Sequence, residues 1–115
     1  METIRPDDGL LRRILALDPN YIKPDNSISS LAFKPRRVDK DGLSVDLERL
    51  TTHSTAVLDR HKFRLARLRA EVPLSLGLQC IHAPLPRNPA HSLIQGNFTH
   101  SARKELAARS QLLRV

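Results

Sequence analysis

The sequence is poor in cysteine and in aromatic residues, and each shortage limits the fold. Cys80 is the only cysteine, so no intramolecular disulfide can form and a secreted, disulfide-stapled scaffold is excluded. Tryptophan is absent, and aromatic residues make up 3% of the 115 residues. Leu, Ile, Val and Ala must therefore supply most of the core, and the length predicts one domain.

Long apolar runs are also missing. No stretch of about 18 apolar residues is present to cross a bilayer. The first residues, METIRPDDG, are too acidic and polar for a secretory signal. We therefore expect a cytoplasmic protein that does not bind a membrane.

Acidic residues are scarce in the second half of the chain. Residues 60–115 contain ten Lys or Arg and two Asp or Glu, whereas residues 1–59 contain nine and ten, and the formal net charge of the whole chain is +7. Such asymmetry attracts an acidic protein partner or a polyanion. The charge alone does not distinguish between them.

Three segments have the features of helices. In residues 7–17 (DDGLLRRILAL), apolar residues recur at helical spacing and the segment ends before Pro19, which predicts a helix. A capping residue among positions 51–54 predicts a short middle helix. In residues 100–115 (HSARKELAARSQLLRV), apolar residues again recur at helical spacing, with Thr99 or Ser101 as the cap.

Alternation of apolar and polar residues predicts the strands. It is clearest in residues 43–47 (LSVDL) and is also present in residues 27–33 (SISSLAF). Residues 61–72 (HKFRLARLRAEV) fit either a strand or part of a long basic helix, and the extended segments that follow favour a strand. These segments are residues 77–85 (GLQCIHAPL) and the short strand AHSLIQG at 90–96.

Together these patterns predict a single α+β domain over residues 1–115, with a small, mostly antiparallel sheet. An N-terminal helix and turn occupy residues 1–26. The sheet region, with its middle helix, occupies residues 27–96. A C-terminal helix at residues 97–115 packs on the sheet.

Cys80, His82 and His91 are the candidates for chemistry. Alternation places Cys80 and His82 on one strand face, where His91 could join them as a third metal ligand. Cys80 could instead be a nucleophile assisted by a histidine, with Asn88 as the orienting group. Neither arrangement has a local signature, so we favour a buried cysteine with hydrogen-bonded histidines and expect no metal and no cofactor.

Two further sets of residues are candidates for binding. Three prolines stiffen residues 84–89, a loop that presents Asn88 and His91 to an acidic or polar ligand, although a local turn before a strand explains the same residues. The second set is a basic surface suited to phosphate contacts, for which a solvated face is the simpler interpretation. Its members are Arg60, Lys62, Arg64, Arg67 and Arg69, with Arg36, Arg37 and Arg87 as extensions.

Several segments taken together resemble a known arrangement. SSLAFKP, DGLSVDLE and PLPRNPAHSLIQG, followed by a short helix, are similar to an uncharacterised group of small bacterial proteins with an FKP…LSV…NPAH arrangement. The resemblance covers about residues 27 to 113. It implies neither an activity nor a cofactor.

Three functions are compatible with these observations. The leading hypothesis is a cytoplasmic, non-catalytic bacterial interaction module that binds a protein partner, in a defence or toxin-control system. The second is a nucleic-acid-binding accessory protein that uses the basic second half. The third is a small hydrolase or metal-dependent enzyme. The sequence leaves the partner and the oligomeric state open.

Overall fold

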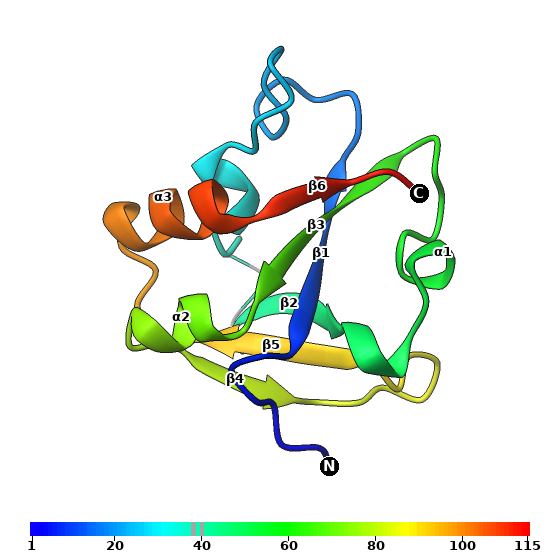
Figure 1. Cartoon of the computed structure of the whole chain (residues 1–115), viewed down its shortest axis with the longest axis vertical. Helices are drawn as coiled ribbons and strands as arrows, with labels where there is room; N and C mark the ends of the chain where they lie inside the picture. The colour runs from blue at the N-terminus through cyan, green and yellow to red at the C-terminus, as the bar shows by residue number, and fades with distance from the viewer. Residues whose placement is uncertain (38, 40) are drawn as a thin grey trace.

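All six strands belong to one antiparallel sheet in the computed structural model, which describes residues 1–37, 39 and 41–115 (Figure 1). The strand order is β4-β5-β2-β1-β3-β6. Along the chain the elements are β1 (Gly9–Leu15), the 3₁₀ helix η1 (Ser30–Phe33), β2 (Leu43–Leu47), the 3₁₀ helix η2 (Glu48–Leu50), α1 (His53–Ala56), β3 (Phe63–Arg69), α2 (Glu71–Ser75), β4 (Gln79–His82), β5 (His91–Gln95), α3 (His100–Arg109) and β6 (Gln111–Leu113).

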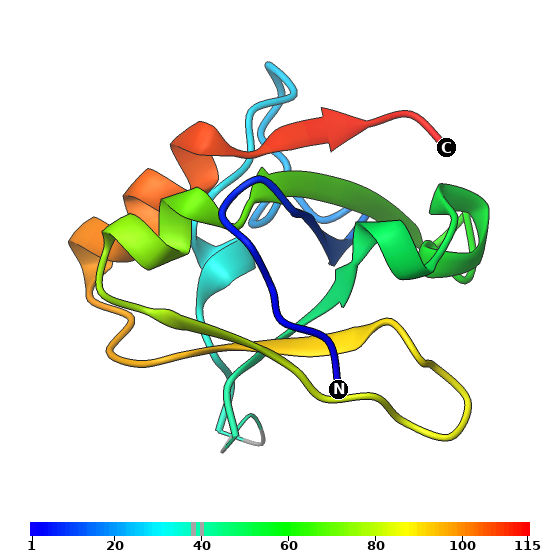
Figure 2. The same ribbon diagram turned by 60° about the horizontal axis from the view of Figure 1, so that its bottom comes forward.

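The sheet bends between β1 and β2. β1 pairs with β3 over its whole length, from Gly9 opposite Arg69 to Leu15 opposite Phe63, but with β2 only at two positions. Figure 2 shows the consequence: β1, β3 and β6 lie across from β2, β5 and β4, with α2 and α3 side by side at one end. The result is a small α+β domain.

Both faces of β1 are buried. Leu10 and Ile14 belong to the larger core cluster, which joins the two halves of the sheet and includes Leu106 of α3. Leu11 points to the other face and packs in a smaller cluster with Val57 and Leu65. Both clusters are mainly aliphatic, as the composition predicts, and Phe33 is the one fully buried aromatic side chain among the described residues.

The predicted N-terminal helix at residues 7–17 is wrong, because this segment forms β1. A strand buried on both faces has apolar residues at successive positions, which also fits helical spacing. Strand geometry places Arg12 and Arg13 on opposite faces.

Two other predictions are corrected. The predicted strand at residues 27–33 forms η1 from Ser30, where the Ser29 side chain accepts a hydrogen bond from the Leu31 N–H. Local side-chain hydrogen bonds of this kind compete with strand pairing. The C-terminal helix ends at Arg109 rather than at the chain end, and residues 111–113 form β6 on the edge of β3.

Other predicted elements are confirmed. Strands lie at residues 43–47 and within the segments predicted at 61–72, 77–85 and 90–96. Thr52 caps the middle helix, and Thr99 caps α3. No helix among the described residues is long and apolar enough to cross a membrane.

Candidate functional site

A polar cleft opens where β1 and β2 diverge. The two strands pair only through Leu10 with Leu47 and Leu11 with Asp46, although β1 continues to Leu15. The cleft beyond this point has a volume of about 490 Å³, within the range of ligand sites. Its polar and charged lining residues include Arg12, Arg13, Arg36, Ser44, Asp46 and His91.

Arg12 bridges the gap between the diverging strands. Its Nε donates to the carbonyl oxygen of Ala32 in η1 at 3.0 Å, and its Nη1 donates to the carbonyl oxygen of Ser44 in β2 at 2.9 Å. The guanidinium therefore satisfies a β2 carbonyl that faces β1 where the ladder has ended. Burial lowers the pKa of Arg12 to about 10, although the nearby Asp39 carboxylate acts in the opposite direction.

Arg12 thus remains a cation at neutral pH in a poorly solvated position. No carboxylate of the described residues lies within 4.0 Å of it. A buried charge without a charged partner is costly, because backbone carbonyl groups replace only part of its hydration. An anionic ligand would offset that cost.

Arg13 lines the same cleft from the other face of the sheet. Its Nη1 donates to the carbonyl oxygen of Ala56 at the end of α1 at 2.8 Å and lies 3.9 Å from Asp46 Oδ2. The guanidinium carbon is 5.7 Å from the centroid of the Phe63 ring, within the range of a cation–π contact. These contacts hold the side chain in one orientation.

Asp46, which is 6% exposed, connects the cleft to the proline-stiffened loop. Its Oδ1 accepts a hydrogen bond from Asn88 Nδ2 at 2.8 Å, and Asn88 Oδ1 accepts from the Ala90 N–H at 3.2 Å. The Asn88 side chain therefore holds the loop against β2. This arrangement matches the local-turn interpretation of Asn88. The side-chain amide groups that a ligand would bind are already engaged in these two hydrogen bonds.

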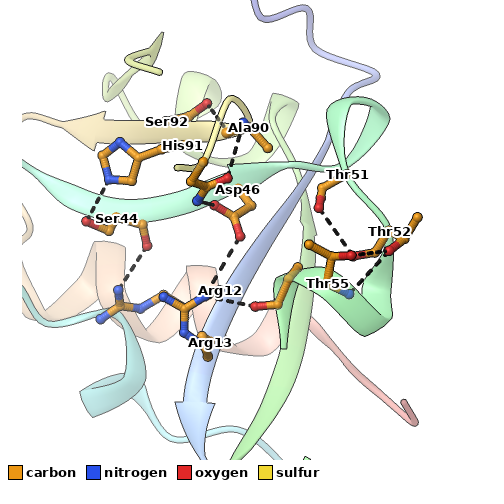
Figure 3. A network of polar contacts seen from close by, with 12 residues as sticks. Arg12, Arg13, Ser44, Asp46, Thr51, Thr52, Thr55, Ala90, His91 and Ser92 are labelled. Carbon is orange, nitrogen blue, oxygen red and sulfur yellow. Dashed lines mark hydrogen bonds and ion pairs between the residues drawn. The ribbon is translucent and has the colours of Figure 1, made fainter. Parts of the chain in front are cut away.

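His91, by contrast, faces the cleft. Its Nδ1 lies 2.8 Å from the carbonyl oxygen of Ala83, which can only accept, so Nδ1 carries the proton of the neutral ring. Its Nε2 lies 3.3 Å from Ser44 Oγ and accepts from that hydroxyl. Figure 3 shows His91 and Ser44 close to Asp46 and the two arginines.

The structure does not bring the predicted basic surface together. Alternation along β3 places Arg64 on the opposite face from Arg67 and Arg69. Arg67 pairs with Glu48 at 2.9 Å, and Arg69 lies 3.4 Å from Glu71.

Arg64, Arg36 and Arg37 have different surroundings again. Arg64 Nη1 donates to the backbone oxygens of Arg60 at 2.6 Å and Phe63 at 3.1 Å. Arg36 lines the cleft and pairs with Asp39 at 3.3 Å, while the neighbouring Arg37 is exposed. Of the ten candidate binding residues, Arg36 and His91 line the cleft.

Cys80, His82 and His91 do not form one site. The β4–β5 register sets Cys80 opposite Ile94 and His82 opposite Ser92, so both share a face that His91 does not. Among the described residues, no group of three His, Cys, Asp or Glu side chains could hold a metal ion.

The surroundings of Cys80 and His82 are those of structural residues. His82 is buried, with Nδ1 2.9 Å from the Glu2 N–H and Nε2 2.7 Å from the carbonyl oxygen of Pro89. Burial raises the pKa of Cys80 to about 11, which disfavours a thiolate nucleophile. The hydrogen-bonded histidines agree with the sequence interpretation, whereas Cys80 is only partly buried.

Arg12, Arg13 and Asp46 were not identified from the sequence. The helix prediction for residues 7–17 rested on their apolar residues and gave the two arginines no role, and Asp46 was one of the polar residues that alternate in LSVDL. One signal was available: in a strand buried on both faces, each arginine must find acceptors inside the protein.

Comparison of the chain with protein-family models, with curated proteins and with solved structures finds no match. The resemblance to the FKP…LSV…NPAH group therefore stays a prediction. The functional argument depends on the chemistry of the cleft.

Proposed function

We propose that the chain is a non-catalytic interaction module that holds an acidic segment of a protein partner in the β1–β2 cleft. The observation that carries the proposal is the Arg12 guanidinium, which is poorly solvated and bound to carbonyl groups instead of a carboxylate. A partner carboxylate would form a charge-assisted hydrogen bond to it at a site where water competes weakly. A cytoplasmic location and a bacterial defence or toxin-control setting remain predictions from the sequence.

An acidic segment also fits the rest of the cleft. Arg13 and Arg36 extend the positive lining on both sides of Arg12, whereas Asp46 already accepts a hydrogen bond from Asn88. Arginine suits this task because its planar guanidinium binds a carboxylate through two parallel hydrogen bonds. The dispersal of Arg64, Arg67 and Arg69 favours this cleft over the broad phosphate-contacting surface that the nucleic-acid hypothesis requires.

The test is the affinity of a capped, fluorescein-labelled peptide with the sequence Glu-Val-Glu-Glu-Glu. We expect Arg12→Gln to weaken binding by about tenfold or more, because one charge-assisted contact is lost. Arg64→Gln removes the same formal charge outside the cleft and is the matched control, for which we expect less than about a twofold change. Equal losses in both variants would mean that net charge alone attracts the peptide.

Two further measurements complete this test. Urea unfolding of Arg12→Gln shows whether the variant is folded under the binding conditions, since the substitution leaves two carbonyl groups without their donor. A DNA duplex is the second probe. Tighter binding of the duplex than of the peptide, abolished by reversing Arg64, Arg67 and Arg69, would replace the proposal with nucleic-acid binding.

A hydrolase is the second candidate, on the strength of one contact. Ser44 Oγ lies 3.3 Å from His91 Nε2, and Ala83 fixes the ring tautomer that leaves Nε2 as a base. Turnover of 4-nitrophenyl acetate that is lost in Ser44→Ala and in His91→Gln would support this activity. Hydrolysis at the same rate in the wild-type protein and in both variants would exclude it.

A further inference from the structure

The register of β1 determines which of its backbone N–H and C=O groups point into the cleft. The N–H of Ala16 donates to the carbonyl oxygen of Lys62 at 2.8 Å, continuing the register that sets Leu15 opposite Phe63. In an antiparallel ladder, alternate residues bond to the same neighbour. Arg12 and Ile14 therefore bond to β3, and the N–H and C=O groups of Arg13 and Leu15 point away from β3 into the cleft.

β2 does not pair with these groups. Its ladder with β1 ends at Leu11 and Asp46, and Arg12 Nη1 occupies the Ser44 carbonyl that would otherwise face Arg13. In the part of the chain that the structure describes, Arg13 and Leu15 thus have no strand partner on this side. A row of free backbone groups is the template that an additional strand pairs with.

We propose that the acidic segment binds as an extended antiparallel strand added to the edge of β1 at Arg13 and Leu15. This inference rests on the proposed function and specifies how the partner binds. Charge identifies the occupant, because the edge lies among the guanidinium groups of Arg12, Arg13 and Arg36. A neutral or basic strand would leave the Arg12 guanidinium without a carboxylate partner.

The side chains beside the edge define the preferred peptide. Arg13 and Leu15 lie on the same face, and Leu15 is 44% exposed. An added strand therefore places an acidic residue opposite Arg13 and, two positions earlier in its own sequence, an apolar residue opposite Leu15. In the peptide Glu-Val-Glu-Glu-Glu, the second residue would lie opposite Leu15 and the fourth opposite Arg13.

N-methylation of single peptide amides tests the inference without changing the protein. In the added strand, the amides of the second and fourth residues donate to β1, and the amide of the third residue points away. We expect methylation at the second or fourth residue to weaken binding by about tenfold and at the third by less than about threefold. The third-residue analogue has the same charge and composition and is the matched control.

The outcomes separate the two proposals. If the unmodified peptide does not bind, the proposed function fails. If it binds and all methylated analogues bind equally well or equally poorly, the cleft holds acidic side chains without strand pairing and only the further inference fails. Slower hydrogen exchange of the Arg13 and Leu15 amides on binding, with no change at Arg64, would support strand addition.

Discussion

At the residue scale, a single carboxylate, that of Glu48, holds neighbouring elements of the fold together. Glu48 accepts hydrogen bonds from Arg67 Nε at 2.9 Å and lies 2.8 Å from His53 Nε2, which ties η2 to β3 and α1. Gly9 leaves room for this carboxylate, since a Cβ at that position would overlap Glu48 Oε1. The absence of a side chain at Gly9 thus lets the Glu48 carboxylate lie against β1.

Replacing Glu48 with Gln should lower the free energy of unfolding at pH 7 by about 1–2 kcal/mol, because Arg67 and His53 lose a charged acceptor. The hydrogen bond from Arg67 holds the pKa of Glu48 below its ordinary value of 4.5. Its contribution is therefore present above pH 4.5 and is lost as the pH falls through the lower, folded-state pKa.

Urea unfolding of the wild type and of Glu48→Gln at several pH values measures this effect. The two stabilities should converge as the pH is lowered below 4.5. Glu71→Gln is the control, because the Arg69–Glu71 pair is exposed and should contribute less. A difference between wild type and Glu48→Gln that stays constant down to acidic pH would contradict the assignment.

Cys80 should react slowly with alkylating reagents. Burial raises the pKa of its thiol to about 11, so the reactive thiolate is scarcer at pH 8 by about two orders of magnitude than in an unfolded chain. The rate of iodoacetamide labelling, followed by mass spectrometry in buffer and in urea, measures the ratio. Equal rates in the two conditions would show that the thiol is accessible and ionised.

At the scale of elements, the segments that the sequence predicted were those with one polar face and one apolar face. The alternation of LSVDL predicted β2, and a cap at Thr99 or Ser101 predicted the start of α3, because a capping hydroxyl bonds a free helix N–H. β1 could not be told from a helix, because Leu10 and Leu11 are buried on opposite faces. β6 was not predicted, because the helical spacing of apolar residues continues after Arg109. Pairing with β3 decides the structure of this segment.

The cleft, too, could be predicted from the sequence only in part. His91 and Arg36 were among the predicted binding residues and do line it. Arg12 and Arg13 were missed because their roles depend on β1 being a strand that leaves β2 at Leu11. That divergence depends on pairings between distant segments, which local sequence patterns do not reveal.

Thr99→Ala should lower the free energy of unfolding by about 1 kcal/mol. The Thr99 side chain accepts a hydrogen bond from the Ala102 N–H at 3.1 Å and caps α3. Thr99→Ser keeps the acceptor and should restore most of the loss, whereas Ser101→Ala at an exposed position should have little effect. Chemical unfolding monitored by circular dichroism compares the variants, and equal stability of Thr99→Ala and wild type would refute the role of the cap.

At the scale of the whole molecule, the short strand β6 protects the edge of β3. It pairs from Leu65 opposite Leu113 to Arg67 opposite Gln111, and Leu112 and Leu113 pack on different core clusters. Without β6, the free backbone groups of β3 would form an exposed edge. The last strand therefore contributes to stability and to the prevention of edge-to-edge association.

Removing residues 111–115 should reduce the free energy of unfolding by about 2–4 kcal/mol, since two partly buried leucines and a ladder are lost. We also expect the truncated chain to associate at its new edge, which sedimentation velocity detects as a concentration-dependent increase in sedimentation coefficient. Removal of residues 114–115 alone is the control, because it takes away the packing of Val115 but leaves the β3–β6 ladder intact. A truncated chain of unchanged stability would contradict this role for β6.

The place of β1 in the sheet sets the order of events during synthesis. It precedes β2 and β3 in the sequence, yet it lies between them in the sheet, and Gly9 pairs with Arg69. At roughly 5–20 residues per second, the segment GLLRRIL must wait on the order of 3–12 seconds for its last pairing partners. During that interval its leucines lack the partners that bury them and are open to chaperones and to other nascent chains.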